Sequence, residues 1–294
     1  MSKLVLGTAQ FGAGYGITNR EGRISDDSVR AILDVADAAG LFLLDTAPDY
    51  GDAQERLGAL AGTGRRPQYV SKFTLPSSGS GPIDVAHLFS RSLDALRVPS
   101  LYGLLFHRVA DLRDHRAADV WNGLREARNR GTLERIGVSI YDSDDLEIVA
   151  RDFTDLDIIQ VPGNVVDRRL LDHPALETLH ANGAEVHVRS AYLQGLLLAE
   201  PADLPEYFAS LRPAVESIRE RAISTETSPA AVCLSFLAGH PSVDRIVVGS
   251  TSAAELAATI TAFDAAPSIA GLDVPPADAE LLDPRTWPPR EDLQ

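Results

Sequence analysis

The chain has 294 residues, of which 45% are hydrophobic and 23% charged, and its formal net charge at pH 7 is −15. These values are typical of a folded protein with a large core, and the negative charge argues against a nucleic-acid-binding surface. The single cysteine, Cys233, excludes an internal disulfide, and we expect it to pack in the core. No apolar run is long enough to span a membrane and the N-terminus lacks a signal-peptide pattern, so we expect a cytoplasmic protein.

Eight short, β-prone apolar runs recur along the chain. They lie at residues 3–7, 41–45, 69–73, 101–107, 134–140, 157–161, 184–190 and 244–249. Most are continuously apolar instead of alternating, which is typical of a parallel sheet that is covered on both faces.

Helical patterns separate these runs. The first, at residues 25–39, begins with a serine that can cap it, carries acidic residues in its first turn and ends before Gly40. The others lie at residues 82–96, 121–130, 143–151, 174–182, 229–239 and 253–263, and a short polar helix begins after Tyr50. Eight strands alternating with helices predict an α/β fold, a single (β/α)8 TIM barrel. An open doubly wound sheet is the alternative.

No linker or change in composition divides the chain, so we expect one domain over residues 1–294. From about residue 265 the sequence is rich in proline and aspartate, which predicts a surface tail packed in part by Leu281, Leu282 and Trp287. The glycine-rich stretch at residues 12–16 does not fit a dinucleotide-binding loop. That loop needs its last glycine at a helix start, whereas residues 17–23 intervene here, and we expect a loop at the barrel rim.

In a barrel of this kind, chemistry gathers where the strands end. The second run ends at Asp45, with Tyr50 in the loop that follows. The third run carries Lys72 near its end, and the fourth ends at His107. Lys72 is one of only two lysines beside 25 arginines, which suggests chemistry that arginine cannot supply.

These four residues have a joint chemical logic. A tyrosine with a pKa of about 10 is a poor acid at neutral pH unless its phenolate is stabilised. We expect the ammonium of Lys72 to lower the pKa of Tyr50, and Asp45 to balance the lysine charge. His107 can orient a carbonyl oxygen or share in proton transfer. Each residue alone has a structural explanation, but together they predict a site that protonates or deprotonates a substrate oxygen.

Several segments in series resemble the aldo-keto reductases. The specific ones are GTAQFG at 7–12, LDTAPDYGDAQERLG at 44–58, VSKF at 70–73 and LLFHR at 104–108. Weaker ones follow in order: IGVS at 136–139, IIQVPGNVVDRR at 158–169, RSAYLQGLLL at 189–198 and VVGSTSAAEL at 247–256.

The resemblance implies an NAD(P)H-dependent oxidoreductase that reduces an aldehyde or ketone to an alcohol. Tyr50 would be the general acid, Lys72 paired with Asp45 would lower its pKa, and His107 would position the carbonyl. NADPH is the implied cofactor and NADH the alternative, and the partner is a small-molecule carbonyl compound. Polar side chains in the rim loops suggest a sugar or natural-product carbonyl. The resemblance further implies cofactor contacts from Thr8, Ser139, Gln160, Asn164, Ser190, Gln194, Gly195, Gly249, Ser250, Ser252 and Glu255.

Two positions depart from the family pattern. Ile140 follows GVS where members often have asparagine, and Gly249 and Glu255 stand where NADPH-preferring members place basic residues. Glu255 would repel a 2′-phosphate or accept a hydrogen bond from a free ribose hydroxyl. Ser250 and Ser252 can also be simple helix caps.

Three other functions were weighed. One is a redox-cofactor-assisted sugar epimerase, and another is a non-catalytic cofactor-binding module on the same barrel. The third, a metal-dependent barrel hydrolase, needs clustered histidines and carboxylates at the strand ends. The first strand end offers Gly7, Thr8 and Gln10 and no His-x-His pair, so we expect no metal.

Overall fold

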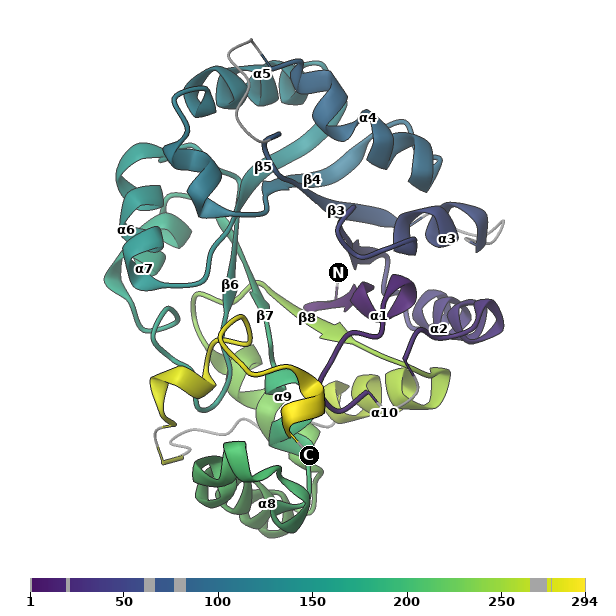
Figure 1. Cartoon of the computed structure of the whole chain (residues 1–294), viewed down its shortest axis with the longest axis vertical. Coiled ribbons are helices and arrows are strands. Elements are labelled where there is room, and N and C mark those ends of the chain that lie inside the picture. Colours follow the sequence, from purple (N-terminus) through teal and green to yellow (C-terminus); the bar gives the residue numbers. More distant parts are fainter. Residues whose placement is uncertain are drawn as a thin grey trace.

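The computed structural model is a closed barrel of eight parallel strands surrounded by helices (Figure 1). It describes residues 2–19, 22–60, 67–76, 83–264, 274–275 and 277–293. Each strand pairs in parallel with the next, and the last pairs with the first. The strands are β1 Leu4–Gly7, β2 Leu43–Asp45, β3 Gln68–Phe73, β4 Leu101–Phe106, β5 Leu133–Ser139, β6 Ile158–Pro162, β7 Glu185–Arg189 and β8 Arg245–Gly249. The predicted TIM barrel is confirmed, and the open-sheet alternative is wrong.

The helices lie in the expected order. They are α1 Ala9–Gly12, α2 Asp26–Ala38, α3 Ala53–Leu60, α4 Val85–Leu96, α5 Ala117–Asn129, α6 Ser143–Asp152, α7 Pro174–Ala181, α8 Arg212–Ser224, α9 Pro229–Gly239 and α10 Ala253–Asp264. Short 3-10 helices are η1 Val109–Arg113, η2 Leu193–Leu198, η3 Pro201–Asp203, η4 Glu206–Leu211, η5 Ala279–Leu281 and η6 Arg290–Leu293.

Helix starts follow the capping residues. Ser25 caps α2 as expected, because its side chain accepts a hydrogen bond from the Ser28 amide. The start predicted for α4 at residue 82 lies outside the described residues. Within them, the helix begins at Val85 because the Asp84 side chain accepts from the Ala86 amide. The sequence analysis missed α8, whose thin apolar stripe, with Val215 and Ile218 buried, lies among charged residues.

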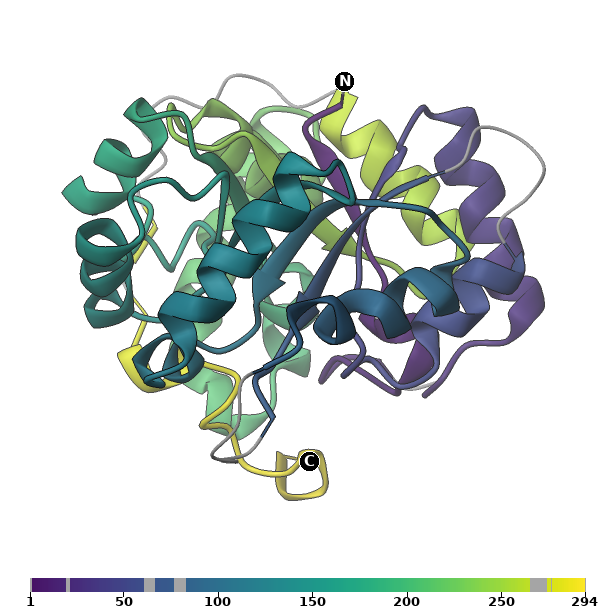
Figure 2. The same ribbon diagram turned by 90° about the horizontal axis from the view of Figure 1, so that it is seen from above.

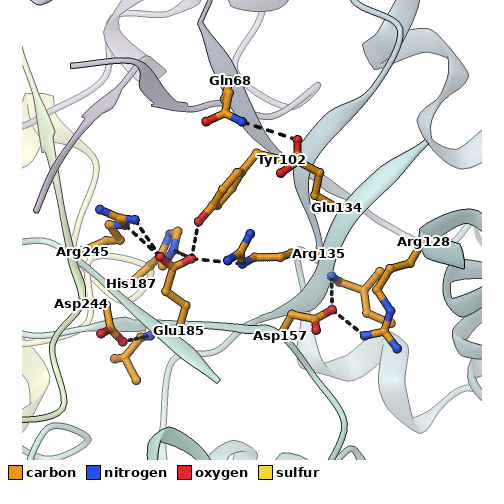
Figure 3. A network of polar contacts seen from close by, with 12 residues as sticks. Gln68, Tyr102, Arg128, Glu134, Arg135, Asp157, Glu185, His187, Asp244 and Arg245 are labelled. Atoms are coloured by element: carbon orange, nitrogen blue, oxygen red, sulfur yellow. Dashed lines mark hydrogen bonds and ion pairs between the residues drawn. The ribbon is translucent and has the colours of Figure 1, made fainter. Parts of the chain in front are cut away.

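The core has an outer layer between the strands and the helices and a smaller cluster inside the barrel. Alternation along each strand divides the side chains between them. On β7, Val186 and Val188 are fully buried in the outer layer, whereas Glu185 and His187 meet in the polar network of Figure 3. Cys233 is fully buried in a separate apolar cluster beneath η2 and α8, as expected.

The network of Figure 3 lies at the barrel end where the strands begin. Glu185 is its centre: the Tyr102 hydroxyl donates to its carboxylate at 2.7 Å and Arg245 Nε at 2.9 Å, and Arg135 Nε lies at 3.5 Å. Burial raises the pKa of Glu185, but the bond from His187, together with Tyr102 and Arg245, outweighs it and lowers the pKa to about 2.

The C-terminal segment packs at the opposite end, where the strands finish (Figure 2). Leu281 and Leu282 are buried, and the Trp287 ring meets the Phe208 ring edge-on at 4.8 Å, so the expected packing of this segment is confirmed. Its predicted start, at about residue 265, lies outside the described residues. Of the helices that the structure describes, none combines the length and apolar character that crossing a membrane requires.

Candidate active site

A buried ion pair lies at the mouth of the barrel. Because β2 and β3 are neighbours, Asp45 at the end of β2 meets Lys72 near the end of β3, with Lys72 Nζ 2.6 Å from Asp45 Oδ1. The same ammonium lies 3.3 Å from the Thr46 carbonyl oxygen and 3.4 Å from the Tyr50 hydroxyl. Lys72 is 1% exposed and Asp45 3%, so the pair is withdrawn from water and its charges interact strongly.

The second oxygen of Asp45 is also bonded. Gln160 Nε2 donates to Asp45 Oδ2 at 2.7 Å, and the Ser139 hydroxyl donates to Gln160 Oε1 at 3.3 Å. A chain of polar contacts therefore crosses the barrel mouth from β5 through β6 and β2 to β3. This chain fixes the carboxylate orientation that faces Lys72.

Two glycines position the loop that carries Tyr50. A Cβ atom on Gly12 would lie 1.8 Å from the Tyr50 carbonyl oxygen, and one on Gly51 would lie 2.3 Å from the Gly12 carbonyl oxygen. Gly51 also has a φ of +63°, a left-handed conformation that favours glycine. The two backbones touch here, so the loop after β1 presses the Tyr50 loop over the ion pair.

The Tyr50 phenol differs from the sequence-based expectation. Burial raises the pKa of Tyr50 well above its usual range, and the negative charge of Asp45 raises it further, while Arg189 opposes both. The net lowering expected for the Tyr50 pKa is therefore wrong, because burial and the charge of Asp45 outweigh the nearby cations. Burial likewise lowers the pKa of Lys72, against the opposing effect of Asp45. At neutral pH the phenol holds its proton.

His107, which follows β4, lies against the tyrosine. The two rings are 6.2 Å apart between centroids and nearly perpendicular, at 83°. His107 Nδ1 lies 3.1 Å from Asp49 Oδ2, a partner that the sequence analysis did not select although it directly precedes Tyr50. Burial and the charge of Lys72 lower the pKa of His107, so the ring is neutral at pH 7. Because a carboxylate only accepts, Nδ1 carries the hydrogen and Nε2 keeps a lone pair.

A pocket of about 280 Å³ opens beside Asp45 and Tyr50 and extends to the start of α10. Six of the eleven predicted cofactor residues line it: Thr8, Ser190, Gln194, Gly195, Gly249 and Glu255. The hydroxyls, amides and backbone groups along it suit an elongated polar molecule such as a dinucleotide. Ser139, Gln160, Asn164, Ser250 and Ser252 lie outside the lining.

These remaining residues hold the surrounding structure. Asn164 Oδ1 accepts from the Val166 and Asp167 amides, and its Nδ2 donates to the Ser190 carbonyl at 3.1 Å. The Ser250 hydroxyl donates to the Ser252 carbonyl at 2.8 Å. Ser252 Oγ accepts from the Glu255 amide, which is the helix-capping alternative.

The loop of residues 13–19 crosses beside the pocket and is bonded to the segment after β7. The Ile17 amide donates to Gln194 Oε1 at 2.9 Å, and the Thr18 hydroxyl donates to the Gln194 carbonyl at 2.8 Å. Gly195 has a φ of +93°, and a Cβ there would lie 2.4 Å from Thr18 Oγ1. The glycine-rich stretch thus forms a rim loop, as expected, and encloses one side of the pocket.

The pocket lining includes residues that were not among the predicted site residues, and Tyr15 and Arg189 are two of them. Tyr15, which is 46% exposed, lines the pocket. Arg189, the last residue of β7, also lines the pocket, and its guanidinium lies 3.9 Å from the centre of the Tyr141 ring. The sequence carried one indication of this: Glu185, His187 and Arg189 alternate along the strand, so they share the face that points into the barrel, and Arg189 stands at its end.

Among the described residues, no group of three or more His, Cys, Asp or Glu side chains could hold a metal ion.

Comparison with known proteins identifies a family. A sequence model described as "Aldo/keto reductase family" matches residues 3–269. Two solved structures from Pseudomonas aeruginosa, both provisionally named aldo-keto reductases, are similar in fold. The first has a TM-score of 0.66 and 24% identity, the second 0.64 and 23%, and each alignment covers 90% of both chains. At these identities the structures support the fold alone. None of the curated proteins matches the chain.

Proposed function

This chain belongs to the aldo/keto reductase family, and we propose that it is an NAD(P)H-dependent oxidoreductase that reduces an aldehyde or ketone to an alcohol. The observation that carries this proposal is the buried pair of Lys72 and Asp45 beneath the Tyr50 hydroxyl, at one end of the pocket. It provides a protonated phenol with a cation 3.4 Å from the oxygen that gives up the proton.

Tyr50 is the proposed general acid. A reduced nicotinamide, when bound, supplies the hydride for the carbonyl carbon. As that C–H bond forms, the electron pair of the C=O bond moves to oxygen, and the Tyr50 hydroxyl donates its proton there. The Lys72 ammonium stabilises the resulting phenolate, and Asp45 with Gln160 keeps the ammonium in place. In the direction of alcohol oxidation the same groups act in reverse.

His107 has a positioning role in this proposal. Its neutral ring, with Nδ1 bonded to Asp49, offers Nε2 as an acceptor. It therefore binds a hydroxyl group better than a bare carbonyl oxygen. We expect it to hold the product alcohol, or a hydroxyl next to the reacting carbonyl.

The residues at the far end of the pocket support NADH over NADPH. Glu255 lines the pocket and accepts hydrogen bonds from the Thr251 amide at 2.7 Å and its hydroxyl at 2.8 Å. If the adenosine end lies here, as in the family, a 2′-phosphate would face this carboxylate, whereas a free ribose hydroxyl could donate to it. We expect Glu255→Gln to improve kcat/KM with NADPH by about tenfold relative to NADH. An unchanged ratio would contradict this role.

The test of the proposed activity is cofactor oxidation over a panel of aldehydes and ketones, with NADH and NADPH measured separately at 340 nm. The proposal expects turnover with at least one carbonyl compound and with one of the two cofactors. Tight cofactor binding without turnover of any compound would contradict it and favour the non-catalytic module.

A further inference from the structure

Arg189 brings a cation into the pocket that contains Tyr50. It ends β7, pairs in register with Pro162 of β6, and lines the pocket with Asp45 and Tyr50. Its charge acts on the catalytic groups, since it lowers the pKa values of Tyr50, Lys72 and His107. Arg189 therefore shares one pocket with the group that is proposed to protonate the substrate.

No carboxylate among the described residues forms an ion pair with this arginine. Within the described ranges, its guanidinium donates one hydrogen bond, to the Ile140 carbonyl at 2.9 Å, stacks on Tyr141, and has no carboxylate partner. The arginines at the other end of the barrel differ from Arg189 in this respect, because Arg135 and Arg245 both form ion pairs with Glu185 (Figure 3). A guanidinium has five N–H donors, so most of those on Arg189 are available to a ligand.

The position of the guanidinium is fixed before any ligand arrives. Tyr141 is held between two guanidinium groups, with Arg189 at 3.9 Å from the ring centre and Arg285 of the C-terminal segment at 3.7 Å. Arg285 in turn is anchored by Asp283 at 2.6 Å. Such a stack, together with the Ile140 carbonyl, limits the rotamers of Arg189 and reduces the entropy lost on binding.

We propose that Arg189 binds a carboxylate of the substrate, so that the enzyme reduces oxo acids to hydroxy acids. A partly buried cation that has no carboxylate partner among the described residues, in a chain with a net charge of −15, marks a place where an anion is recognised locally. A carboxylate matches the planar fork of arginine and can accept two parallel hydrogen bonds from it. A 2-oxo acid could place this group on Arg189 and its neighbouring carbonyl at Tyr50.

The inference rests on the proposed function and keeps its stoichiometry. The carbonyl carbon gains the hydride, its oxygen gains the Tyr50 proton, and NAD(P)H is oxidised to NAD(P)+. The carboxylate is unchanged, and its only role is recognition. Arg189 is thus a determinant of specificity and not a proton donor.

The test compares one ketone with and without its charge: phenylglyoxylate and its methyl ester. We expect the wild type to prefer the acid, and Arg189→Gln to raise KM for the acid by about 10- to 150-fold, the range for a hydrogen-bonded charge pair. KM for the ester should change by less than about threefold. Arg189→Lys, which keeps the charge but not the fork, should fall between. Arg285→Gln removes the second guanidinium from Tyr141 but keeps the fork of Arg189, so it should change the acid-to-ester ratio by less than Arg189→Gln does.

Equal losses on acid and ester in Arg189→Gln would overturn the proposal. So would a weaker Kd for NADH or NADPH in that variant, measured by fluorescence without substrate, because the arginine would then serve the cofactor. A change of the acid-to-ester ratio in Arg285→Gln as large as that in Arg189→Gln would also overturn it, by assigning the effect to Tyr141.

A separate readout distinguishes failure of this inference from failure of the reductase assignment. If the wild type reduces neither compound, phenylglyoxylate is titrated into the cofactor-free protein by calorimetry. Binding that is lost in Arg189→Gln supports the carboxylate site. Binding that is unchanged in the variant, or absent in the wild type, contradicts it.

Discussion

Replacing Glu185 with glutamine tests whether the two ends of the barrel have separate tasks. Glu185 lies at the end where strands begin, and its side chain is 15% exposed. Its pKa falls from the usual 4.5 to about 2 on folding. Since a tenfold change in proton affinity corresponds to about 1.4 kcal/mol, this carboxylate contributes about 3 kcal/mol to the free energy of unfolding at pH 7.

The sign of the pH dependence follows from the direction of this pKa change. A carboxyl group whose pKa is lower in the folded state stabilises above its unfolded pKa, and the contribution is lost as the pH falls through its folded pKa. The difference in unfolding free energy between wild type and Glu185→Gln should therefore be about 3 kcal/mol at pH 7. It should shrink steadily below about pH 4.5.

The measurement is urea unfolding followed by circular dichroism between pH 7 and pH 3. Glu134→Gln is the matched control in the same network, because Glu134 is exposed and, among the described residues, meets only Gln68, at 3.4 Å. This control should change stability by less than about 0.5 kcal/mol. Turnover of Glu185→Gln at 25 °C should stay within about twofold of wild type, since the active sites of this fold lie at the other end of the barrel, where the strands finish. A stable Glu185→Gln protein with abolished turnover would refute the reasoning.

Two further changes test how the Tyr50 loop and the pair of Lys72 and Asp45 are held. Gly12→Ala should reduce kcat by about 100-fold in a steady-state assay, because its Cβ would lie 1.8 Å from the Tyr50 carbonyl oxygen and displace the loop. Gly239→Ala is the control, since a Cβ there would have no neighbour within 4 Å, and it should leave kcat unchanged. Equal effects of the two changes would count against the backbone contact. Lys72→Met should lower the unfolding free energy by about 3–5 kcal/mol because Asp45 is left buried and unpaired. Adding Asp45→Asn should restore more than about 1 kcal/mol of the unfolding free energy, measured by urea unfolding, but should restore no turnover. A double variant that is no more stable than the single one would contradict this.

The sequence predicted the barrel, and the meeting of Asp45, Tyr50 and Lys72 at its mouth, because both depend on local patterns. Continuous apolar runs gave the strands, and in a parallel barrel neighbouring strand ends must meet. Asp45, Lys72 and His107 lie at or just after the ends of three successive strands, so the strand order alone predicts that they share one rim.

Other features depend on packing that local patterns do not encode. The pKa direction of Tyr50 follows first from the burial of the phenol and then from the charge of Asp45, which together outweigh the nearby cations. The roles of Arg189 and Tyr141 become visible only when the C-terminal segment, with Arg285, is docked on the rim. Helix α8 was missed because its apolar stripe is narrow and its neighbours are charged.

The central claim is that Tyr50 protonates the substrate oxygen, and Tyr50→Phe tests it most directly. Phenylalanine keeps the ring beside His107 and removes only the hydroxyl next to Lys72. With a carbonyl substrate found in the panel, kcat should fall by about 10²- to 10⁴-fold, the usual contribution of a general acid. The Kd for the reduced cofactor should stay within about twofold. A Tyr50→Phe protein that oxidises the cofactor at the wild-type rate would contradict the account.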